Sequence, residues 1–410
     1  MKRVVVTGMA GLSPIGNDWN AIRQRLNDLQ TGIETMAEWS AYEGLNTRLA
    51  APVKDFAMPP HYKRKALRSM GRIAQLATLA TEWALSDAGL LNHPVLESGQ
   101  AGVAYGSSAG SFHALADFGN MLLNFATDGL NANSYIKMMA HTAPVNIGVH
   151  FGLRGRVITT SSACTSGSQG IGYAYEAIKY GRQTVMVAGG AEELSPTEAA
   201  VFDTLYATSV RNDEPTRTPR PFDAGRDGLV IGEGAGTLIL EELEHARARG
   251  AHIYAELVGF GTNSDGAHVT QPSPETMEGA MRLALQDAAI DSERIGYVSA
   301  HGTATERGDV AESHATHAVF GNRVPVSAFK SFTGHTLGAC GALEAWTAIE
   351  MMNAGWFHAT ANLEAVDPEC ADLDYIVETG RRIETDYVMS NNFAFGGINT
   401  SLIFKRWAEG

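Results

Sequence analysis

Residues 159–178 read TTSSACTSGSQGIGYAYEAI, and this stretch places one cysteine among small residues where the local pattern changes. The preceding residues, FGLRGRVITTSS, are rich in β-branched side chains that favour a strand. After the cysteine, Ile171, Ala174 and Ile178 recur at the spacing of one helix face. Cys164 is therefore predicted to lie at a turn from a strand into a helix.

This position has a chemical consequence for the thiol of Cys164. The free N–H groups and the positive end of the helix dipole stabilise a thiolate at the start of a helix. A nucleophile fits such a position. The alternative is a buried cysteine that packs as a small hydrophobic residue, and the stretch alone does not decide between the two.

The composition is that of a globular protein with a large core, because 44% of the 410 residues are hydrophobic and only 19% are charged. The three cysteines, Cys164, Cys340 and Cys370, form no CxxC pair and no disulfide framework, which favours a reducing compartment. The N-terminal MKRVVVTGMAGLSP lacks the apolar core of a signal peptide and is predicted to be the first strand. No apolar run approaches the roughly 18 residues that span a bilayer. The expected location is the cytoplasm.

The net charge of −14 argues against a general nucleic-acid-binding protein. One segment differs from this average, because no acidic residue occurs between Asp55 and Glu82. The same segment carries five basic residues: Lys63, Arg64, Lys65, Arg68 and Arg72. A basic patch on an acidic protein indicates an acidic partner, and a merely solvated helix face is the alternative.

The sequence also contains an internal repeat. Residues 330–350, KSFTGHTLGACGALEAWTAIE, overlie the opening stretch at an offset of 171, with Cys164 on His335 and Gly167 on Gly338. Two further pairs of segments match: residues 226–242 with residues 391–405, and VVVTGMAGL near residue 4 with AELVGFGTN near residue 255. Short β-rich runs such as VMVAGGAE alternate with helical stretches, which indicates an α/β protein built from a diverged duplication.

Four motifs together carry a family resemblance. They are SSACTSGSQGIG around Cys164, AHGTATERGD around His301, KSFTGHTLGACGALEA with Lys330, His335 and Glu344, and NNFAFGGINTSLIF near the C-terminus. Over essentially its whole length the chain resembles the β-ketoacyl-acyl carrier protein synthases of the elongating Cys-His-His type, within the thiolase-like superfamily. The resemblance implies a five-layered α-β-α-β-α fold, with one half at residues 1–250 and the other at residues 251–410.

The resemblance also implies a decarboxylative Claisen condensation, in fatty acid or in polyketide and polyene elongation. Cys164 takes an acyl group as a thioester, which divides the reaction into two easier steps. The backbone N–H groups of Cys164 and Phe395 bind the thioester oxyanion, and Gly396 permits the close approach. His301 and His335 act as neutral donors to the enolate that malonyl-carrier protein forms when it loses CO₂. No metal and no other cofactor are expected.

Further residues take supporting roles in this interpretation. Lys330 and Glu344 order the histidines electrostatically, with a purely structural ion pair as the alternative. Thr303 and Thr305 hydrogen-bond the phosphopantetheine arm, unless they only cap a turn. Phe395 also gates the acyl pocket, unless it is a core residue. The predicted acyl pocket contains Ala109 and Phe202.

An acyl carrier protein is the expected partner, docking at the basic residues Lys63, Arg64, Lys65 and Arg68. The resemblance implies a homodimer, or a heterodimer with a ketosynthase-like subunit, and neither nucleic acid nor a membrane span. Tyr206 stands where such synthases often have a carrier-docking arginine. The departures at Ala394 and Ile398 are compatible with a specialised lipid or polyketide pathway.

Two other functions remain to be weighed. A biosynthetic thiolase condenses without decarboxylation and needs a second catalytic cysteine near the C-terminus, but AFGGIN at residues 394–399 contains none. A chain-length factor keeps the fold as a non-catalytic partner subunit but lacks the nucleophile, so Cys164 argues against it.

Overall fold

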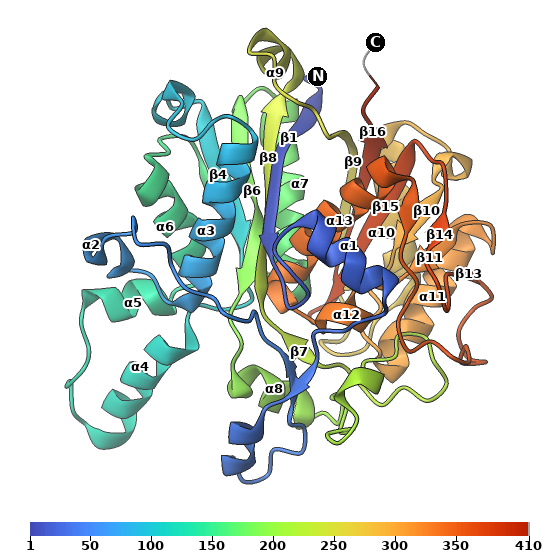
Figure 1. The fold of residues 1–410 in the computed structure, drawn as a ribbon, viewed down its shortest axis with the longest axis horizontal. Coiled ribbons are helices and arrows are strands. Elements are labelled where there is room, and N and C mark those ends of the chain that lie inside the picture. The colour runs from blue at the N-terminus through green and yellow to red at the C-terminus, as the bar shows by residue number, and fades with distance from the viewer. Residues whose placement is uncertain (409–410) are drawn as a thin grey trace.

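The longest sheet of the protein runs through the whole molecule (Figure 1). The computed structural model describes residues 1–408, and eleven strands within them follow the order β13-β11-β10-β15-β16-β9-β1-β8-β6-β4-β5. One half-sheet consists of β1 (Val4–Leu12), β8 (Gly234–Glu242), β6 (Val185–Glu192), β4 (Ala101–Gly106) and β5 (Val157–Thr160). The other consists of β9 (Ala255–Ser264), β16 (Ile398–Arg406), β15 (Tyr387–Ala394), β10 (Tyr297–Ser299), β11 (Pro325–Ser327) and β13 (Asp374–Tyr375).

The strand order confirms the internal duplication. Counted outward from the middle, β1-β8-β6-β4-β5 in the first half matches β9-β16-β15-β10-β11 in the second. The two halves join where β1 and β9 pair antiparallel, with Val4 opposite Leu257 and Val6 opposite Ala255. Both predicted pairs of segments therefore occupy equivalent strands, β1 with β9 and β8 with β16.

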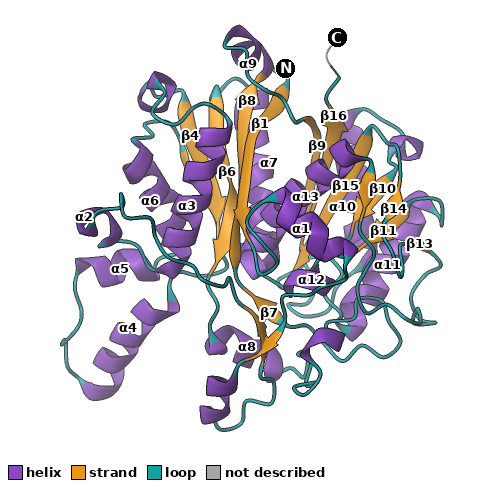
Figure 2. Cartoon of the chain, in the orientation of Figure 1, coloured by secondary structure: helices purple, strands orange, loops and turns teal. Residues whose placement is uncertain are grey.

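Helices cover the half-sheets in layers (Figure 2). The helices α7 (Ser166–Lys179) and α13 (Cys340–Ala354) pack against each other and against strands of both halves, so they form the central layer. One outer layer contains α3 (Arg72–Asp87) and α6 (Thr142–Phe151), and the other contains α10 (Pro274–Ala288) and α11 (Glu306–Phe320). The predicted α-β-α-β-α fold is confirmed.

The register of the predicted repeat is wrong by three residues. A 3-10 turn precedes each central helix, Ala163–Thr165 before α7 and Leu337–Ala339 before α13. Ala163 and Leu337 both have positive φ, 51° and 42°. The structural offset is therefore 174 rather than 171, and Cys164 corresponds to Gly338 instead of His335.

Contacts between the two central helices support the corrected register. A Cβ atom added at Gly167 would contact Ala342, and one added at Gly341 would contact Ser168. These two contacts exchange under a twofold rotation only if the offset is 174. The error arose because each motif contains two glycines three residues apart, Gly167 and Gly170 in one and Gly338 and Gly341 in the other, so a shift of three residues aligns both pairs.

The remaining elements surround this framework. The other helices are α1 (Trp19–Asn27), α2 (Arg64–Leu67), α4 (Phe112–Asn124), α5 (Ala132–Met138), α8 (Pro196–Asp203), α9 (Leu243–Ala248) and α12 (Lys330–Thr333). Two small sheets contain β2 (Glu34–Thr35), β3 (Leu49–Ala51) and β7 (Ile231–Gly232), and β12 (Trp356–Phe357) and β14 (Arg381–Arg382). The predicted division after residue 250 falls between α9 and β9 and stays a prediction. Within residues 1–408, no helix is long and apolar enough to cross a membrane.

Candidate active site

Cys164 lies at the predicted turn between a strand and a helix. The strand β5 ends at Thr160, the 3-10 turn holds Cys164, and α7 begins at Ser166. The residue is only 4% exposed, and its sulfur lies 2.9 Å from Nε2 of His335. The positive φ of Ala163 turns the chain sharply just before the thiol.

Burial has a larger effect on this thiol than the start of the helix. Desolvation raises the pKa of Cys164 to about 11, although the Lys330 ammonium and the backbone N–H groups of Phe395 and Cys164 itself lower it in part. A helix start alone predicts a stabilised thiolate. The structure instead holds a protonated thiol at neutral pH, with two amide donors directed at its sulfur.

Hydrogen bonds fix the tautomers of both predicted histidines. The Leu337 N–H donates to Nδ1 of His335 at 3.3 Å, so Nε2 carries the hydrogen and donates toward Cys164. The Lys330 ammonium donates to Nδ1 of His301 at 3.0 Å, which leaves the Nε2–H of His301 for the cavity. The two rings lie edge to face, with centroids 5.2 Å apart.

Both imidazoles are neutral. Burial, followed by the nearby Lys330 ammonium, lowers the pKa of His301 and of His335 well below the ordinary value of histidine. A neutral imidazole with hydrogen on Nε2 is a hydrogen-bond donor. The pair therefore presents two N–H donors, that of His335 toward the thiol and that of His301 toward the cavity, without a positive charge on either ring.

Lys330 connects the histidines to a buried polar network. Its ammonium contacts Glu344 Oε1 at 2.5 Å, while the Asn392 side-chain amide donates to Glu344 Oε2 at 2.6 Å. Burial lowers the pKa of Lys330, but the neighbouring Cys340 and Glu344 outweigh it, so the pKa is raised and the ammonium persists. Because the Lys330 ammonium also contacts His301, the Lys330–Glu344 ion pair is more than a structural pair in the core.

The Lys330 ammonium also disfavours a cation at a neighbouring group of side chains. Ligand atoms of His301, Cys340 and Glu344 lie within 4.8 Å of one another, but the positive charge of Lys330 repels a metal ion there.

Two carboxyl groups that the sequence analysis missed hold the loop after His301. Glu312 accepts the backbone N–H groups of His301 and Gly302 at 2.6 and 2.7 Å. Asp309 accepts those of Thr303 and Ala304, each at 3.1 Å. Burial raises the pKa of Glu312 to about 8 and that of Asp309 to about 6. Their spacing, i and i+3 on α11 directly after the loop, is the signal that could have identified them.

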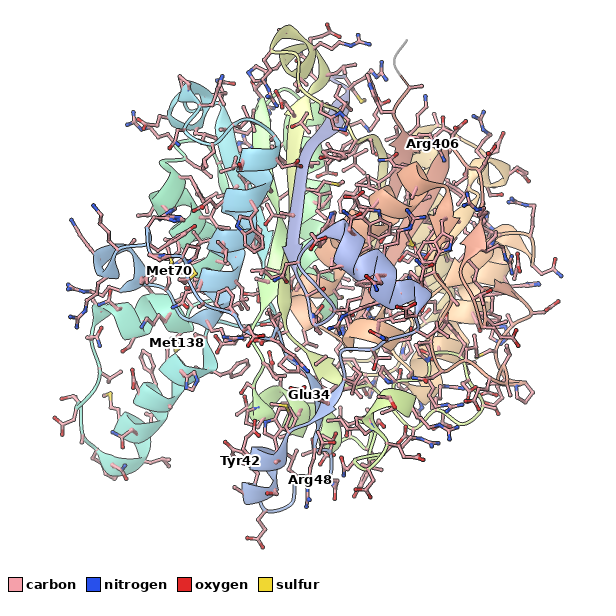
Figure 3. All side chains as sticks on the ribbon, viewed as in Figure 1. Glu34, Tyr42, Arg48, Met70, Met138 and Arg406 are labelled. Carbon is pink, nitrogen blue, oxygen red and sulfur yellow. The ribbon has the colours of Figure 1, made fainter. Side chains whose placement is uncertain are left out.

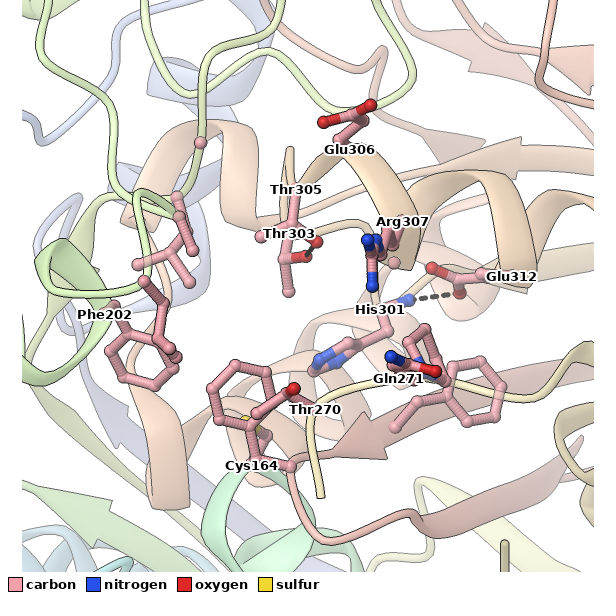
Figure 4. A pocket seen from close by; sticks show the side chains of 18 of the residues that line it. Cys164, Phe202, Thr270, Gln271, His301, Thr303, Thr305, Glu306, Arg307 and Glu312 are labelled. Carbon is pink, nitrogen blue, oxygen red and sulfur yellow. Dashed lines mark hydrogen bonds between the residues drawn. The ribbon is translucent and has the colours of Figure 1, made fainter. Parts of the chain in front are cut away.

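The two predicted pantetheine threonines line the same cavity. Their hydroxyl oxygens lie 2.9 Å apart, and Figure 4 shows both beside His301. Thr305 is the N-cap residue of α11, yet its side chain makes no capping hydrogen bond. Because one hydroxyl of the pair keeps a free hydrogen, the pair can donate to a ligand.

The turn between β15 and β16 brings Phe395 to the thiol. Gly396 and Gly397 have φ of 91° and 68°, which a side chain would strain. The Gly396 N–H donates to the Val269 carbonyl at 2.8 Å, so this amide is not free to bind an oxyanion. Gly396 therefore contributes its backbone conformation, and the backbone N–H of Phe395 remains to bind the oxyanion. The Phe395 ring contacts that of Phe202, with centroids 5.1 Å apart.

A cavity of about 850 Å³ joins these groups. Its lining includes Cys164, His301, His335, Thr303, Thr305, Phe202 and Phe395. In Figure 4, Phe202 lies across the cavity from His301. Ala109 is not among the lining residues; it lies in the turn after β4, where its carbonyl accepts the Ser107 hydroxyl at 2.6 Å. Its place in an acyl pocket stays a prediction.

The basic segment lies on the outside of the first half. Lys63, Arg64, Lys65 and Arg68 are exposed on and beside α2, and none forms an ion pair with another described residue. Figure 3 shows nitrogen-tipped side chains projecting outward there, and Met70 at the inner end of the segment. Arg72 is different, because its guanidinium binds both oxygens of Glu233 at 2.7 Å and lies over Phe56. Arg72 is therefore a structural residue rather than part of a free basic patch.

Two protein-family models match the sequence: "Beta-ketoacyl synthase, N-terminal domain" over residues 1–246 and "Beta-ketoacyl synthase, C-terminal domain" over residues 254–364. The chain is 41% identical to "3-oxoacyl-[acyl-carrier-protein] synthase 2" of Vibrio harveyi, over 100% of this chain and 99% of that protein. It is 58% identical to a beta-ketoacyl synthase from Burkholderia phymatum STM815, whose crystal structure matches with a TM-score of 0.99 over the full length of both chains. A ketosynthase solved with its acyl-carrier protein and bound to a hexaketide, AntDE:AntF, matches with a TM-score of 0.88 at 30% identity, over 99% of this chain and 100% of that one.

Proposed function

The chain belongs to the β-ketoacyl synthase family, and from this premise we propose that it is a 3-oxoacyl-[acyl-carrier-protein] synthase. It is an acyltransferase that joins an acyl group to a two-carbon unit from malonyl-carrier protein. The substrates arrive on the phosphopantetheine arm of an acyl carrier protein, and the enzyme needs no cofactor of its own. The products serve fatty acid or polyketide chain elongation.

In the first step the enzyme becomes acylated. The sulfur of Cys164 attacks the carbonyl carbon of the carrier thioester, and the backbone N–H groups of Cys164 and Phe395 hold the oxyanion. The C–S bond to the carrier then breaks, and the proton of the Cys164 thiol goes to the departing pantetheine sulfur. Because the thiol pKa is high, proton removal accompanies attack rather than preceding it.

In the second step malonyl-carrier protein loses CO₂ and its electron pair moves into an enolate. The Nε2–H groups of His301 and His335 donate to the enolate oxygen, which neutral imidazoles do without protonating carbon. The enolate carbon then attacks the acyl carbonyl on Cys164. The new C–C bond forms, the C–S bond breaks, and the sulfur leaves as a thiolate that takes up a proton from water.

One observation carries this proposal: a single thiol and two neutral imidazoles converge in one buried site. Ligand atoms of Cys164, His301 and His335 lie within 4.8 Å of one another. Thr303 and Thr305 stand beside His301, where a pantetheine arm enters along the cavity. A non-catalytic partner subunit needs none of these contacts.

The test separates the enzyme from a non-catalytic subunit. Incubation with cerulenin, which mimics an acyl group and reacts with thiols, should add one molecule per chain at Cys164, measured by intact mass and peptide mapping. Cys164→Ala should remove both the adduct and condensation, whereas Cys164→Gln should keep malonyl decarboxylation by imitating the acylated state. Normal elongation by Cys164→Ala would contradict the proposal.

The assembled state is part of the proposal: the enzyme is a homodimer. Its support is an apolar surface on the protruding α4 and the following turn (Figure 1), where Leu122, Leu123 and Phe125 are 73%, 79% and 93% exposed. Contiguous apolar exposure of this kind is typical of a surface that another subunit covers. Light scattering should give twice the chain mass, and Leu123→Asp with Phe125→Asp should give monomers. A heterodimer with a ketosynthase-like subunit is the alternative, and a monomeric wild type would favour it.

A further inference from the structure

Among the described residues, one buried carboxyl group, on α8, has no hydrogen-bond partner at either oxygen. Glu198 on α8 is only 5% exposed, and within residues 1–408 neither of its buried oxygens has a hydrogen-bond partner. Leaving a buried polar group unpaired costs free energy, and native proteins pair the great majority of such groups. The mechanism above does not use Glu198. Its position therefore calls for a function.

The position of Glu198 on its helix relates it to the acyl site. Glu198 and Phe202 are four residues apart on α8 and share its buried face with Ala199. Ala199 and Phe202 pack in one apolar cluster with Cys164, and Phe202 lines the cavity against Phe395. Glu198 thus lies about one helical turn, roughly 6 Å along the axis, from Phe202. Glu198 itself is not among the residues that line the cavity, so a group on the acyl chain reaches this carboxyl only beyond Phe202.

The surroundings of Glu198 keep it protonated. Burial first, and then the nearby carboxyl groups of Glu192, Glu193 and Glu233, raise the pKa of Glu198 well above its ordinary value. Glu193 and Glu233 have hydrogen-bond partners at both oxygens, whereas Glu192 has them at only one. Glu192 accepts backbone N–H groups of Ser108 and Gly338, Glu193 those of Ile73 and Phe112, and Glu233 binds Arg72. Glu198 is left as a neutral acid with one O–H donor and one carbonyl acceptor.

A metal ion does not explain the group of carboxyl side chains around Glu198. Among the described residues, the two sets of side chains with metal-ligand spacing are the one at Cys164 and the one at Glu344, and neither includes Glu198. A neutral acid in an apolar pocket fits an uncharged polar group better. Such a group must reach the carboxyl from the thiol side, where the cluster of Phe202 and Ala199 borders it.

We infer that Glu198 is a specificity-determining residue that hydrogen-bonds an oxygen substituent, such as a hydroxyl or phenol group, on the acyl chain carried by Cys164. The inference rests on the proposed function, because it concerns the acyl group of that reaction. A plain alkyl chain leaves the carboxyl unpaired, and sites built to hydrogen-bond a substrate reject the analogue that lacks the bond. The enzyme therefore prefers oxygen-bearing acyl groups over alkyl groups of equal length.

The experiment measures acylation of Cys164 by intact mass, using pantetheine thioesters of octanoate and of octanoates hydroxylated at mid-chain or at the end, together with a hydroxybenzoyl thioester. Wild type should react with at least one oxygen-bearing thioester about tenfold to a hundredfold faster than with octanoyl thioester. Glu198→Met should lose this preference and accept octanoyl at least as well as wild type. Glu198→Gln should keep most of the preference, because the amide offers the same donor and acceptor.

Val201→Ala is the matched control, since Val201 lies on the same helix and is 57% exposed. It should leave the preference unchanged. Acylation of wild type without discrimination, or an unchanged preference in Glu198→Met, would overturn the inference and leave the proposed function intact. Failure of every thioester to acylate wild-type Cys164 would overturn the proposed function itself. Glu198→Gln keeps the size of the side chain, so it reports on the site even if Glu198→Met is unstable.

Discussion

The two central helices begin with the same backbone turn but carry different chemistry. In the first half the turn before α7 holds Cys164, and in the second the equivalent position before α13 is Gly338. His335 lies three residues earlier, on the approach to that turn. Duplication therefore provided two equivalent helix starts, and the side chain of only one of them became a nucleophile.

Neighbours from the first half require a glycine at position 338. A Cβ atom at Gly338 would lie 2.7 Å from Ser107 Cα and 2.8 Å from Ser108 N. The Gly338 N–H donates to Glu192, which also holds Ser108. One helix start thus exposes a reactive side chain to the cavity, while the other is packed against the first half and leaves His335 to face the thiol.

The largest expected effect concerns the imidazoles, which come only from the second half. His301→Ala and His335→Ala should each slow CO₂ release from malonyl-carrier protein by about 10² or more, because each removes one donor to the enolate. Radiolabelled CO₂ release measures this. Cys164 acylation should fall much less in His301→Ala, since His301 does not contact the thiol. The exposed His113→Ala is the control, and unchanged CO₂ release in both cavity variants would contradict the assignment.

Much of this arrangement could be predicted from the sequence. The change from β-branched residues to helical spacing located Cys164, and the repeated order of motifs indicated two halves. The register could not be fixed, because each motif has a pair of glycines three residues apart and only the backbone turn decides between the two offsets. The high pKa of Cys164 depends on burial by distant segments, which a local motif does not record.

The acids were missed for a related reason. Glu198 lies on the 8-residue α8 and Glu312 on the 15-residue α11, and a glutamate on a helix is usually exposed to solvent. Their burial results from neighbours on other elements, such as the loop after His301 for Glu312. Arg72 shows the reverse case, because it continues a basic run in the sequence but turns inward to Glu233.

A second prediction tests the equivalence of the two turns through stability. Gly338→Ala should lower the free energy of unfolding by about 1–3 kcal/mol, because the added methyl group overlaps backbone atoms of Ser107 and Ser108. Gly148→Ala in α6 is the matched control, since no atom lies within 4 Å of its added Cβ, and it should be neutral or slightly stabilising. Thermal and urea unfolding measure both. Equal stability of the two variants would show that the second turn also tolerates a side chain.

A third prediction tests whether burial or the helix start has the larger effect on the pKa of the Cys164 thiol. With a pKa of about 11, the thiolate fraction of Cys164 should rise about tenfold per pH unit between pH 7 and pH 10, because the thiol stays protonated below its pKa. The rate of iodoacetamide alkylation, followed by peptide mass spectrometry at Cys164, should rise in proportion. Cys164→Ala gives the background from Cys340 and Cys370. A plateau below pH 9 would mean that the helix start and the amide donors outweigh burial.

The smallest expected effect concerns a feature that only the first half carries. The segment before α3 contains Lys63, Arg64, Lys65 and Arg68, whereas no lysine or arginine occurs between Arg249 and Arg282, the region before the equivalent helix α10. If an acidic carrier protein docks at the basic segment, Lys63→Glu with Arg64→Glu should raise KM for malonyl-carrier protein about three- to tenfold with little change in kcat, because exposed charge pairs each contribute little. The difference should shrink in 1 M salt, where the Debye length is about 3 Å. Arg48→Glu with Arg182→Glu makes the same change in net charge at exposed positions elsewhere and should leave KM near that of wild type. An equal rise in KM for both double variants would assign the effect to overall charge, and the basic segment would then be only a solvated surface.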